Sequence, residues 1–113
     1  MNKNPKESSL QKAIIDHLNK IGFLAWRNNT GAFGGEYKGK KWYVKFGIPG
    51  SADIFAIVEK GRFLGIEVKR KGRLPSPQQN AWMQMIREAG GIAIWVDNWD
   101  SYVTFSSLMK WPI

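Results

Sequence analysis

The segment Phe46–Arg70, FGIPGSADIFAIVEKGRFLGIEVKR, decides the fold expected for this chain. One acid, Asp53, precedes a first apolar run, and a second apolar run ends in Glu67–Lys69. The intervening Glu59–Gly61 is a three-residue loop ending in glycine, which suits a type I turn closed by a residue at positive φ. The segment is therefore predicted to be a β-hairpin.

The loop length fixes the register of this hairpin. If Val58 pairs with Arg62, then Asp53 lies opposite Glu67, and both carboxylates share one face with Lys69. A one-residue shift would separate the two acids, so the prediction depends on the loop. The opposite face is expected to be core because it is wholly apolar: Ile54, Ala56, Val58, Leu64, Ile66 and Val68.

Apolar residues also flank the charges, so the hairpin is predicted to be buried on both sides and central in its sheet. Two neighbouring carboxylates in such a place repel each other unless a cation neutralises them. Their hard oxygens suit Mg²⁺ or Mn²⁺. Lys69 would then stabilise a phosphorane-like transition state or orient and deprotonate the attacking water. In the alternative interpretation, Glu67 and Lys69 are a charged strand end and Asp53 caps a turn.

Four motifs occur in order along the chain: Gly50-Ser51-Ala52-Asp53-Ile54, Gly65-Ile66-Glu67-Val68-Lys69-Arg70, Ser76-Pro77-x-Gln79 and Ala89-Gly90-Gly91. This ordered set resembles the VRR-NUC branch of the PD-(D/E)xK nuclease superfamily, and the resemblance runs from Glu7 to about Val96. Ala52 departs from the superfamily name, which has proline there, at a position that tolerates change.

The resemblance implies a metal site. Asp53 and Glu67 would hold Mg²⁺ or Mn²⁺, with the Val68 carbonyl as a further ligand. Glu7, in the first turn of the first helix, would complete the site. Alternatively, Glu7 only favours the helix dipole and closes a capping box.

The resemblance also implies roles for two other residues. Lys69 would be the catalytic cation, and Gln79 would support the attacking water or a nearby phosphate. Gln78 is the substitute if the register of the helix differs. Alternatively, Gln79 only caps its helix, because Ser76 and Pro77 form a typical helix start.

Composition agrees with a nucleic-acid partner. The chain has 113 residues, enough for one domain, with 17 Lys and Arg against 9 Asp and Glu and a net charge of +8. Such a basic domain favours a polyanion. Zero cysteines and one histidine exclude a disulfide scaffold and argue against a zinc cluster. Without a signal peptide or a membrane-spanning run, we expect a cytoplasmic protein of a bacterial or phage-infected cell.

A basic, aromatic insert at 32–45 is predicted to form a small hairpin turning at Gly39-Lys40. We expect it to lie beside the catalytic hairpin, with lysines on the nucleic-acid backbone and rings stacked on bases. Alternatively, its lysines form a solvated edge that resists strand pairing. The residues concerned are Tyr37, Lys38, Lys40, Lys41, Trp42, Tyr43 and Lys45.

Two other segments extend the predicted nucleic-acid surface. The resemblance places Arg27, Asn29 and Thr30 near the active site, where they would contact phosphate, although they also suit an ordinary turn. Directly after Lys69, more cations continue the basic surface: Arg70, Lys71 and Arg73.

The remaining segments complete the fold. A first helix is predicted from Asn4 as cap to Gly22, with His17 at the boundary of an apolar face of Leu10, Ala13, Ile14, Leu18 and Ile21. A strand at 23–27, a helix after Ser76, a strand at 92–96 and a last helix follow. The last helix should pack on the sheet through Tyr102, Phe105, Leu108 and Met109. The order predicts an α/β sandwich with a mixed central sheet flanked by helices, a restriction-endonuclease-like core.

These observations predict a divalent-metal-dependent endonuclease that hydrolyses DNA phosphodiesters. Stand-alone VRR-NUC proteins resemble junction resolvases and nickases, so branched DNA and a homodimer presenting two sites are expected. So short a nuclease would select its substrate by shape or symmetry. A non-catalytic binding module on the same fold, or a nuclease targeted by a partner protein, remains as an alternative.

Overall fold

A computed structural model describes residues 5–29 and 31–113, with side chains described except at 5, 31–33 and 44–46. Asn4, the predicted helix cap, and Thr30 lie outside the described residues. The elements are α1 (Pro5–Lys20), β1 (Leu24–Arg27), β2 (Gly31–Tyr37), β3 (Lys40–Phe46), β4 (Ile54–Ile57), the 3₁₀ turn η1 (Glu59–Gly61), β5 (Phe63–Val68), α2 (Pro77–Glu88), β6 (Ile92–Val96) and α3 (Trp99–Leu108).

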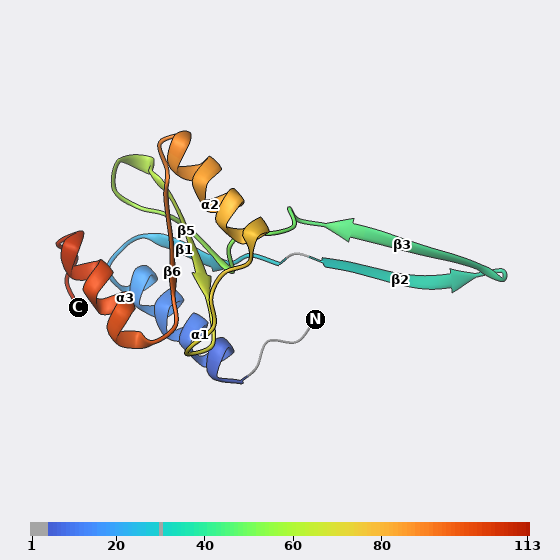
Figure 1. Cartoon of the computed structure of the whole chain (residues 1–113), viewed down its shortest axis with the longest axis horizontal. Helices are drawn as coiled ribbons and strands as arrows, with labels where there is room; N and C mark the ends of the chain where they lie inside the picture. The colour runs from blue at the N-terminus through green and yellow to red at the C-terminus, as the bar shows by residue number, and fades with distance from the viewer. Residues whose placement is uncertain (1–4, 30) are drawn as a thin grey trace.

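A four-stranded sheet in the order β1-β4-β5-β6 forms the centre of the molecule (Figure 1). Strands β5 and β6 are parallel, and the other neighbours are antiparallel. Helices α1 and α3 pack on one face of the sheet, and α2 packs on the other. The predicted mixed α/β fold is confirmed, and the β4–β5 hairpin occupies the two central positions.

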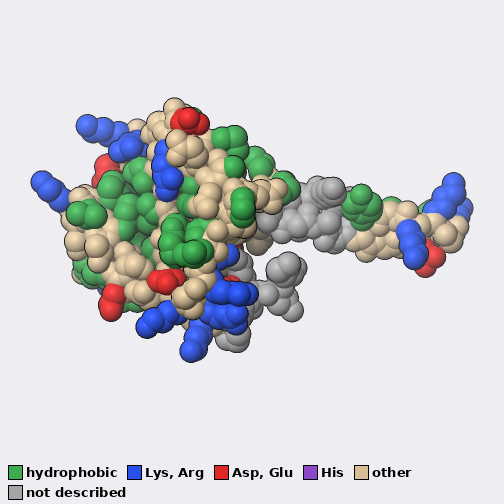
Figure 2. Space-filling model, viewed as in Figure 1, with side chains coloured by type: hydrophobic (Ala, Val, Ile, Leu, Met, Phe, Trp, Pro, Cys, Tyr) green, Lys and Arg blue, Asp and Glu red, His purple; other side chains and the backbone are tan. Residues whose placement is uncertain are grey.

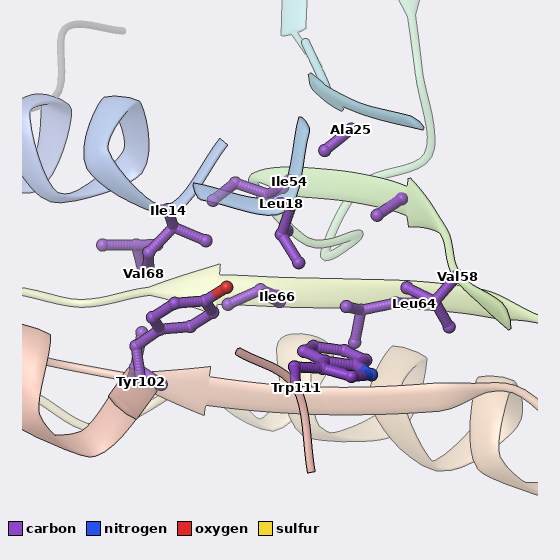
Figure 3. Packing of buried hydrophobic residues seen from close by; sticks show 12 residues of the cluster. Ile14, Leu18, Ala25, Ile54, Val58, Leu64, Ile66, Val68, Tyr102 and Trp111 are labelled. Atoms are coloured by element: carbon purple, nitrogen blue, oxygen red, sulfur yellow. The ribbon is translucent and has the colours of Figure 1, made fainter. Parts of the chain in front are cut away.

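The predicted register of the central hairpin is also confirmed. Ile54 pairs with Ile66, and the Val58 N–H donates to the Arg62 carbonyl at 2.9 Å. All six residues of the predicted apolar face lie in the main core. Figure 3 shows hairpin side chains packed between Ile14 and Leu18 of α1 and the rings of Tyr102 and Trp111.

The helices bury slightly different faces from those predicted. In α1, Ala13 is exposed and Gln11 is buried. In α3, Leu108 is 78% exposed and Ser106 is fully buried. Ser106 lies one turn after the buried Tyr102, whereas Leu108 points about 200° away from Ser106 around the helix. The expected core position of Leu108 is therefore wrong.

His17 is a satisfied boundary histidine, as one would expect at the edge of an apolar face. Its Nδ1 lies 2.6 Å from the hydroxyl of Tyr102, and its Nε2 lies 2.8 Å from the carbonyl of Pro112. Burial raises the pKa of the Tyr102 phenol above its ordinary value. The two contacts of His17 join α1 to α3 and to the C-terminal segment.

The basic insert forms the β2–β3 hairpin, whose strands pair only with each other in a second sheet. The turn residues are Lys38 and Gly39, with φ of 51° and 77°, as a type I′ turn requires. The predicted turn was one residue late. The hairpin projects from the core and makes the molecule 56 Å long (Figure 1). The expectation that the whole insert lies beside the central hairpin is therefore wrong, because its lysine-rich tip is its most distant part.

Candidate active site

Asp53 and Glu67 meet at one end of the central hairpin. Val58 and Arg62 form a hydrogen-bonded pair, and such pairs alternate with non-hydrogen-bonded ones along an antiparallel ladder. Continued along the strands, this alternation places Asp53 and Glu67 at a non-hydrogen-bonded position. Side chains approach most closely at such positions, where the Cα atoms are about 4.5 Å apart. The two carboxylates are therefore cross-strand neighbours on the α2 face.

Asp53 is fixed by the backbone of the opposite strand. Its Oδ2 accepts a hydrogen bond from the Val68 N–H at 2.8 Å. This bond takes the place of a ladder bond beyond the end of β4, where the chain turns away at Ala52. The side chain is thus held at the end of the sheet.

Glu67 is 1% exposed, although it is an acid beside another acid. Like charges directly opposite each other destabilise a sheet, and a buried charge requires compensation. Within residues 5–29 and 31–113, no group of three or more His, Cys, Asp and Glu side chains is placed to hold a metal ion. The pair still fits Mg²⁺, which is commonly held by one or two carboxylates with water and phosphate filling the shell.

Lys69 reaches the first turn of α2. Its Nζ donates to Gln79 Oε1 at 3.3 Å, and the same oxygen accepts the Ser76 N–H at 2.8 Å. Ser76 Oγ accepts the Gln79 N–H at 3.1 Å and completes a capping box. Gln79 therefore caps its helix and orients Lys69 at the same time. Helix capping by Gln79 is therefore compatible with a role beside Lys69.

Gly50, three residues before Asp53, leaves room for the backbone of α2. Gly50 has a φ of 83°, and a Cβ there would come within 2.9 Å of the Gln78 carbonyl oxygen. The small residue thus lets α2 approach the segment that leads to Asp53. Gln78, the substitute considered for Gln79, packs on Gly50, whereas Gln79 contacts Lys69.

Glu7 lies in a neighbouring hollow at the start of α1. It is half-buried, and the hollow has a volume of about 300 Å³. Lys69 lines this hollow and also lies on the same face of the hairpin as Asp53 and Glu67. The predicted role of Glu7 in the metal site stays a prediction. The hollow is lined mainly by charged side chains: Lys6, Glu7, Lys69, Arg70, Lys71 and Asp97. Figure 2 shows basic side chains gathered at the lower edge of the core.

The structure adds Asn28, whose role the sequence prediction missed. Its N–H donates to the Asp53 carbonyl at 2.8 Å. Its Nδ2 donates to Ser51 Oγ at 2.9 Å and to the Ala52 carbonyl at 2.8 Å. Asn28 therefore ties the end of β1 to the segment that carries Asp53. Arg27 and Asn29, predicted to contact phosphate, are exposed on either side of it.

Gln11 is a second residue that the prediction missed. It lies one turn after Glu7 on the same face of α1, and it is 2% exposed. Its Nε2 has no hydrogen-bond partner among the described residues. A polar residue at apolar helical spacing was the available signal, since Gln11 precedes Ile14 and Leu18 by one and two turns.

The other predicted nucleic-acid contacts lie in two places. Arg70, Lys71 and Arg73 are exposed next to the site, in the loop between β5 and α2. Lys38, Lys40 and Lys41 are exposed at the tip of the β2–β3 hairpin, away from the carboxylates. Lys45 lies in β3, and its side chain is outside the described set.

Comparison with known proteins gives a match in structure only. No family model matches the chain, and no curated protein matches it. A solved structure described as "VRR_NUC domain" superposes with a TM-score of 0.66 at 20% identity, covering 90% of this chain and 95% of that one. The chain has the fold of a VRR_NUC domain. The sequence resemblance is thereby confirmed for the fold, a nuclease fold, and the identity of 20% extends it no further.

Proposed function

We propose that this protein is a divalent-metal-dependent endonuclease that hydrolyses DNA phosphodiester bonds. The observation that carries the proposal is the arrangement at the end of the central hairpin. There Asp53 and Glu67 are cross-strand neighbours, and Lys69 on the same face is held by Gln79. The likeness in fold to a VRR_NUC domain supports the same class of chemistry.

The donor set suits a hard cation. Asp53 and Glu67 supply carboxylate oxygens, and the Val68 carbonyl points toward β4, as does its N–H, which donates to Asp53. A bound Mg²⁺ or Mn²⁺ would neutralise the two acids and polarise the phosphate to be cleaved. Glu7 is the proposed further acid, reaching the site from α1.

Lys69 supplies the positive charge beside the reacting phosphate. Its hydrogen bond to Gln79 restricts the ammonium group, so it stabilises negative charge on phosphate oxygens without having to reorganise first. Arg70 and Lys71 follow on the rim and would hold neighbouring phosphates. The described helices include none long and apolar enough to cross a membrane, and DNA is the partner proposed.

A branched substrate and a homodimer belong to the same proposal. Cations occur both at the site and at the tip of a projecting hairpin, which suits DNA that leaves the site in more than one direction. Exposed apolar side chains available for contacts with a second copy occur singly on β6 and α3: Trp95, Trp99 and Leu108. Two sites related by a twofold axis would match a two-fold junction.

Cleavage of labelled DNA tests this proposal. Four-way junction, flap, fork and linear duplex are incubated with Mg²⁺, Mn²⁺ or EDTA and the wild type, Asp53→Ala or Lys69→Ala. Glu88→Ala, at the exposed end of α2, serves as the control for loss of one charge. We expect metal-dependent cutting that both site variants lose and the control retains. Binding without cutting under any metal would favour a non-catalytic binding module.

A further inference from the structure

The β2–β3 hairpin, here called the arm (Gly31–Phe46), is built as a ribbon outside the core. Its strands form a separate two-stranded sheet, and it extends away from the helices (Figure 1). An isolated two-stranded hairpin is at best marginally stable in water. A partner that covers the arm would therefore contribute to its order.

Glycines keep the ribbon thin where its rings lie. In the register, Gly35 pairs with Trp42 and Gly34 pairs with Tyr43. A Cβ on Gly35 would come within 2.9 Å of the Trp42 ring, so the indole lies across the glycine of the opposite strand. Trp42 is 45% exposed and Tyr43 is 67% exposed. Successive residues of a strand face opposite sides, so Trp42 and Tyr43 lie on opposite sides of the ribbon. Tyr37, 67% exposed, lies on the same side as Trp42.

The tip of the arm is basic. Lys38, Lys40 and Lys41 are exposed there, and the only acid between positions 34 and 43 is Glu36, which pairs with Lys41 in the register. The Lys38 ammonium lies 5.4 Å from the centre of the Tyr37 ring. This combination of cations and exposed rings fits a polyanion. A second copy of the arm would bring the same positive charge and be repelled, so DNA is the favoured occupant.

We infer that the arm lies in the major groove of duplex DNA that flanks the cleaved bond. The major groove admits a two-stranded β-ribbon, and the lysines of the tip would contact phosphates at its rim. Seven residues per strand span about 24 Å, which corresponds to about seven base pairs of DNA. The position of the cleaved bond in this inference rests on the proposed function.

The base of the arm is tied to the candidate site. Asn28, three residues before the arm, donates its backbone N–H to the carbonyl of Asp53 at 2.8 Å. The base of the arm is therefore its end nearer to Asp53, and the tip is its distant end. Contacts at the tip should matter only when the DNA on that side is long enough to reach it.

The test measures binding of catalytically blocked protein, with Ca²⁺ in place of Mg²⁺, to labelled forks. The flanking duplexes have about 4, 8 or 14 base pairs, shortened on one side at a time at about 0.1 M salt. The arm variant carries Lys38→Gln, Lys40→Gln and Lys41→Gln. Its control carries Lys20→Gln, Lys60→Gln and Lys110→Gln, which remove the same charge from exposed positions. These positions lie at the end of the four-stranded sheet that is away from Asp53. Lys60 and Lys110 also match the positive φ of Lys38.

We expect the wild type and the control to bind the longest flank about tenfold more tightly than the arm variant, with no such difference on the shortest flank. The salt slope of the arm variant on the long flank should fall by about 2 to 3, one phosphate contact per lysine. Equal affinity of the arm variant and the control on every flank would overturn the inference. So would a wild-type dimer that the arm variant alone loses in sedimentation, because the arm would then bind a second copy.

The same experiment separates this inference from the proposed function. A length-dependent effect of the arm on binding, in a protein that cuts no DNA with Mg²⁺ or Mn²⁺, would support the arm and contradict the nuclease. Metal-dependent cutting without an effect of the arm variant at any flank length would support the nuclease and contradict the inference about the arm.

Discussion

At the scale of single residues, Gln79 connects helix stability to the chemistry proposed at Lys69. Its Oε1 accepts from both the Ser76 N–H and Lys69 Nζ. A capping glutamine is common, but here the capping oxygen also accepts from the lysine to which the proposed function assigns the catalytic charge. Stability and activity should therefore separate when the two partners are changed one at a time.

Ser76→Ala removes the hydroxyl that caps the Gln79 N–H, whereas Gln79→Ala also removes the oxygen that holds Lys69. Both variants should lower the free energy of unfolding by about 1 kcal/mol, as loss of a cap does. Only Gln79→Ala should also lower single-turnover cleavage, by about 10- to 100-fold, because Lys69 is no longer positioned. Urea unfolding and cleavage of a labelled fork measure both effects. Equal rates for the two variants would show that Gln79 is only a cap.

Residue types and the hairpin register could predict that Asp53, Glu67 and Lys69 share one face, whereas the role of Gln79 was implied only by the family resemblance. The roles of these four residues in catalysis stay predictions. Residue types and register could not predict the contacts of Asn28 or the burial of Gln11. Asn28 stands in a turn-rich segment where any asparagine fits, and its role depends on a strand that is distant in sequence. Gln11 stands at apolar helical spacing, which signals burial, but its polar side chain is of a type usually found on the exposed face of a helix.

At the scale of elements, α2 is positioned by contact with the segment before β4. A Cβ on Gly50 would meet the Gln78 backbone, whereas a Cβ on Gly61 would meet nothing within 4 Å. Both glycines have positive φ, at 83° and 72°. The pair therefore separates backbone strain from displacement of the helix.

Gly61→Ala should lower the free energy of unfolding by about 1 kcal/mol, from the left-handed backbone alone. Gly50→Ala should lower it by about 2 to 4 kcal/mol, because overpacking adds to the same strain. Since α2 carries Gln79, Gly50→Ala should also slow cleavage under conditions where both variants are folded. Thermal unfolding followed by circular dichroism and a cleavage assay at low temperature test this. Similar losses in the two variants would contradict the close packing of α2.

The tie between β1 and the Asp53 segment provides another matched pair. Asn28→Ala removes two side-chain hydrogen bonds and should lower the free energy of unfolding by about 1 to 3 kcal/mol. The neighbouring Asn29 is exposed, so Asn29→Ala should change stability by less than about 0.5 kcal/mol. Urea unfolding distinguishes them. If Asn29→Ala is the more destabilising, the placement of this turn is wrong.

The register of the central hairpin could be predicted because a three-residue loop leaves one pairing that buries the apolar face. The position of the β2–β3 hairpin could not. Its glycines and exposed rings specify strand pairing but include no run that must pack on the core. The lysines therefore predicted the charge of this hairpin correctly, but its predicted position beside the central hairpin was wrong.

At the scale of the whole molecule, charge is divided between two regions. A compact core carries the acids, Lys69 and the basic rim, and the arm carries a second group of lysines at the far end of a molecule 56 Å long. The order of elements predicted the core, because helix, strand, hairpin, helix and strand leave few ways to form one mixed sheet. The overall shape depends on the arm and became visible only in three dimensions.

The measurement that tests the account most directly is single-turnover cleavage of the preferred DNA by Glu67→Gln with Mg²⁺. Glutamine keeps the size of this buried side chain and removes the charge that would bind the cation. The rate should fall by at least about 100-fold, while affinity for the DNA, measured with Ca²⁺, stays within about threefold. A folded Glu67→Gln protein that cuts DNA at the rate of the wild type would contradict the assignment of this carboxylate pair as the active site.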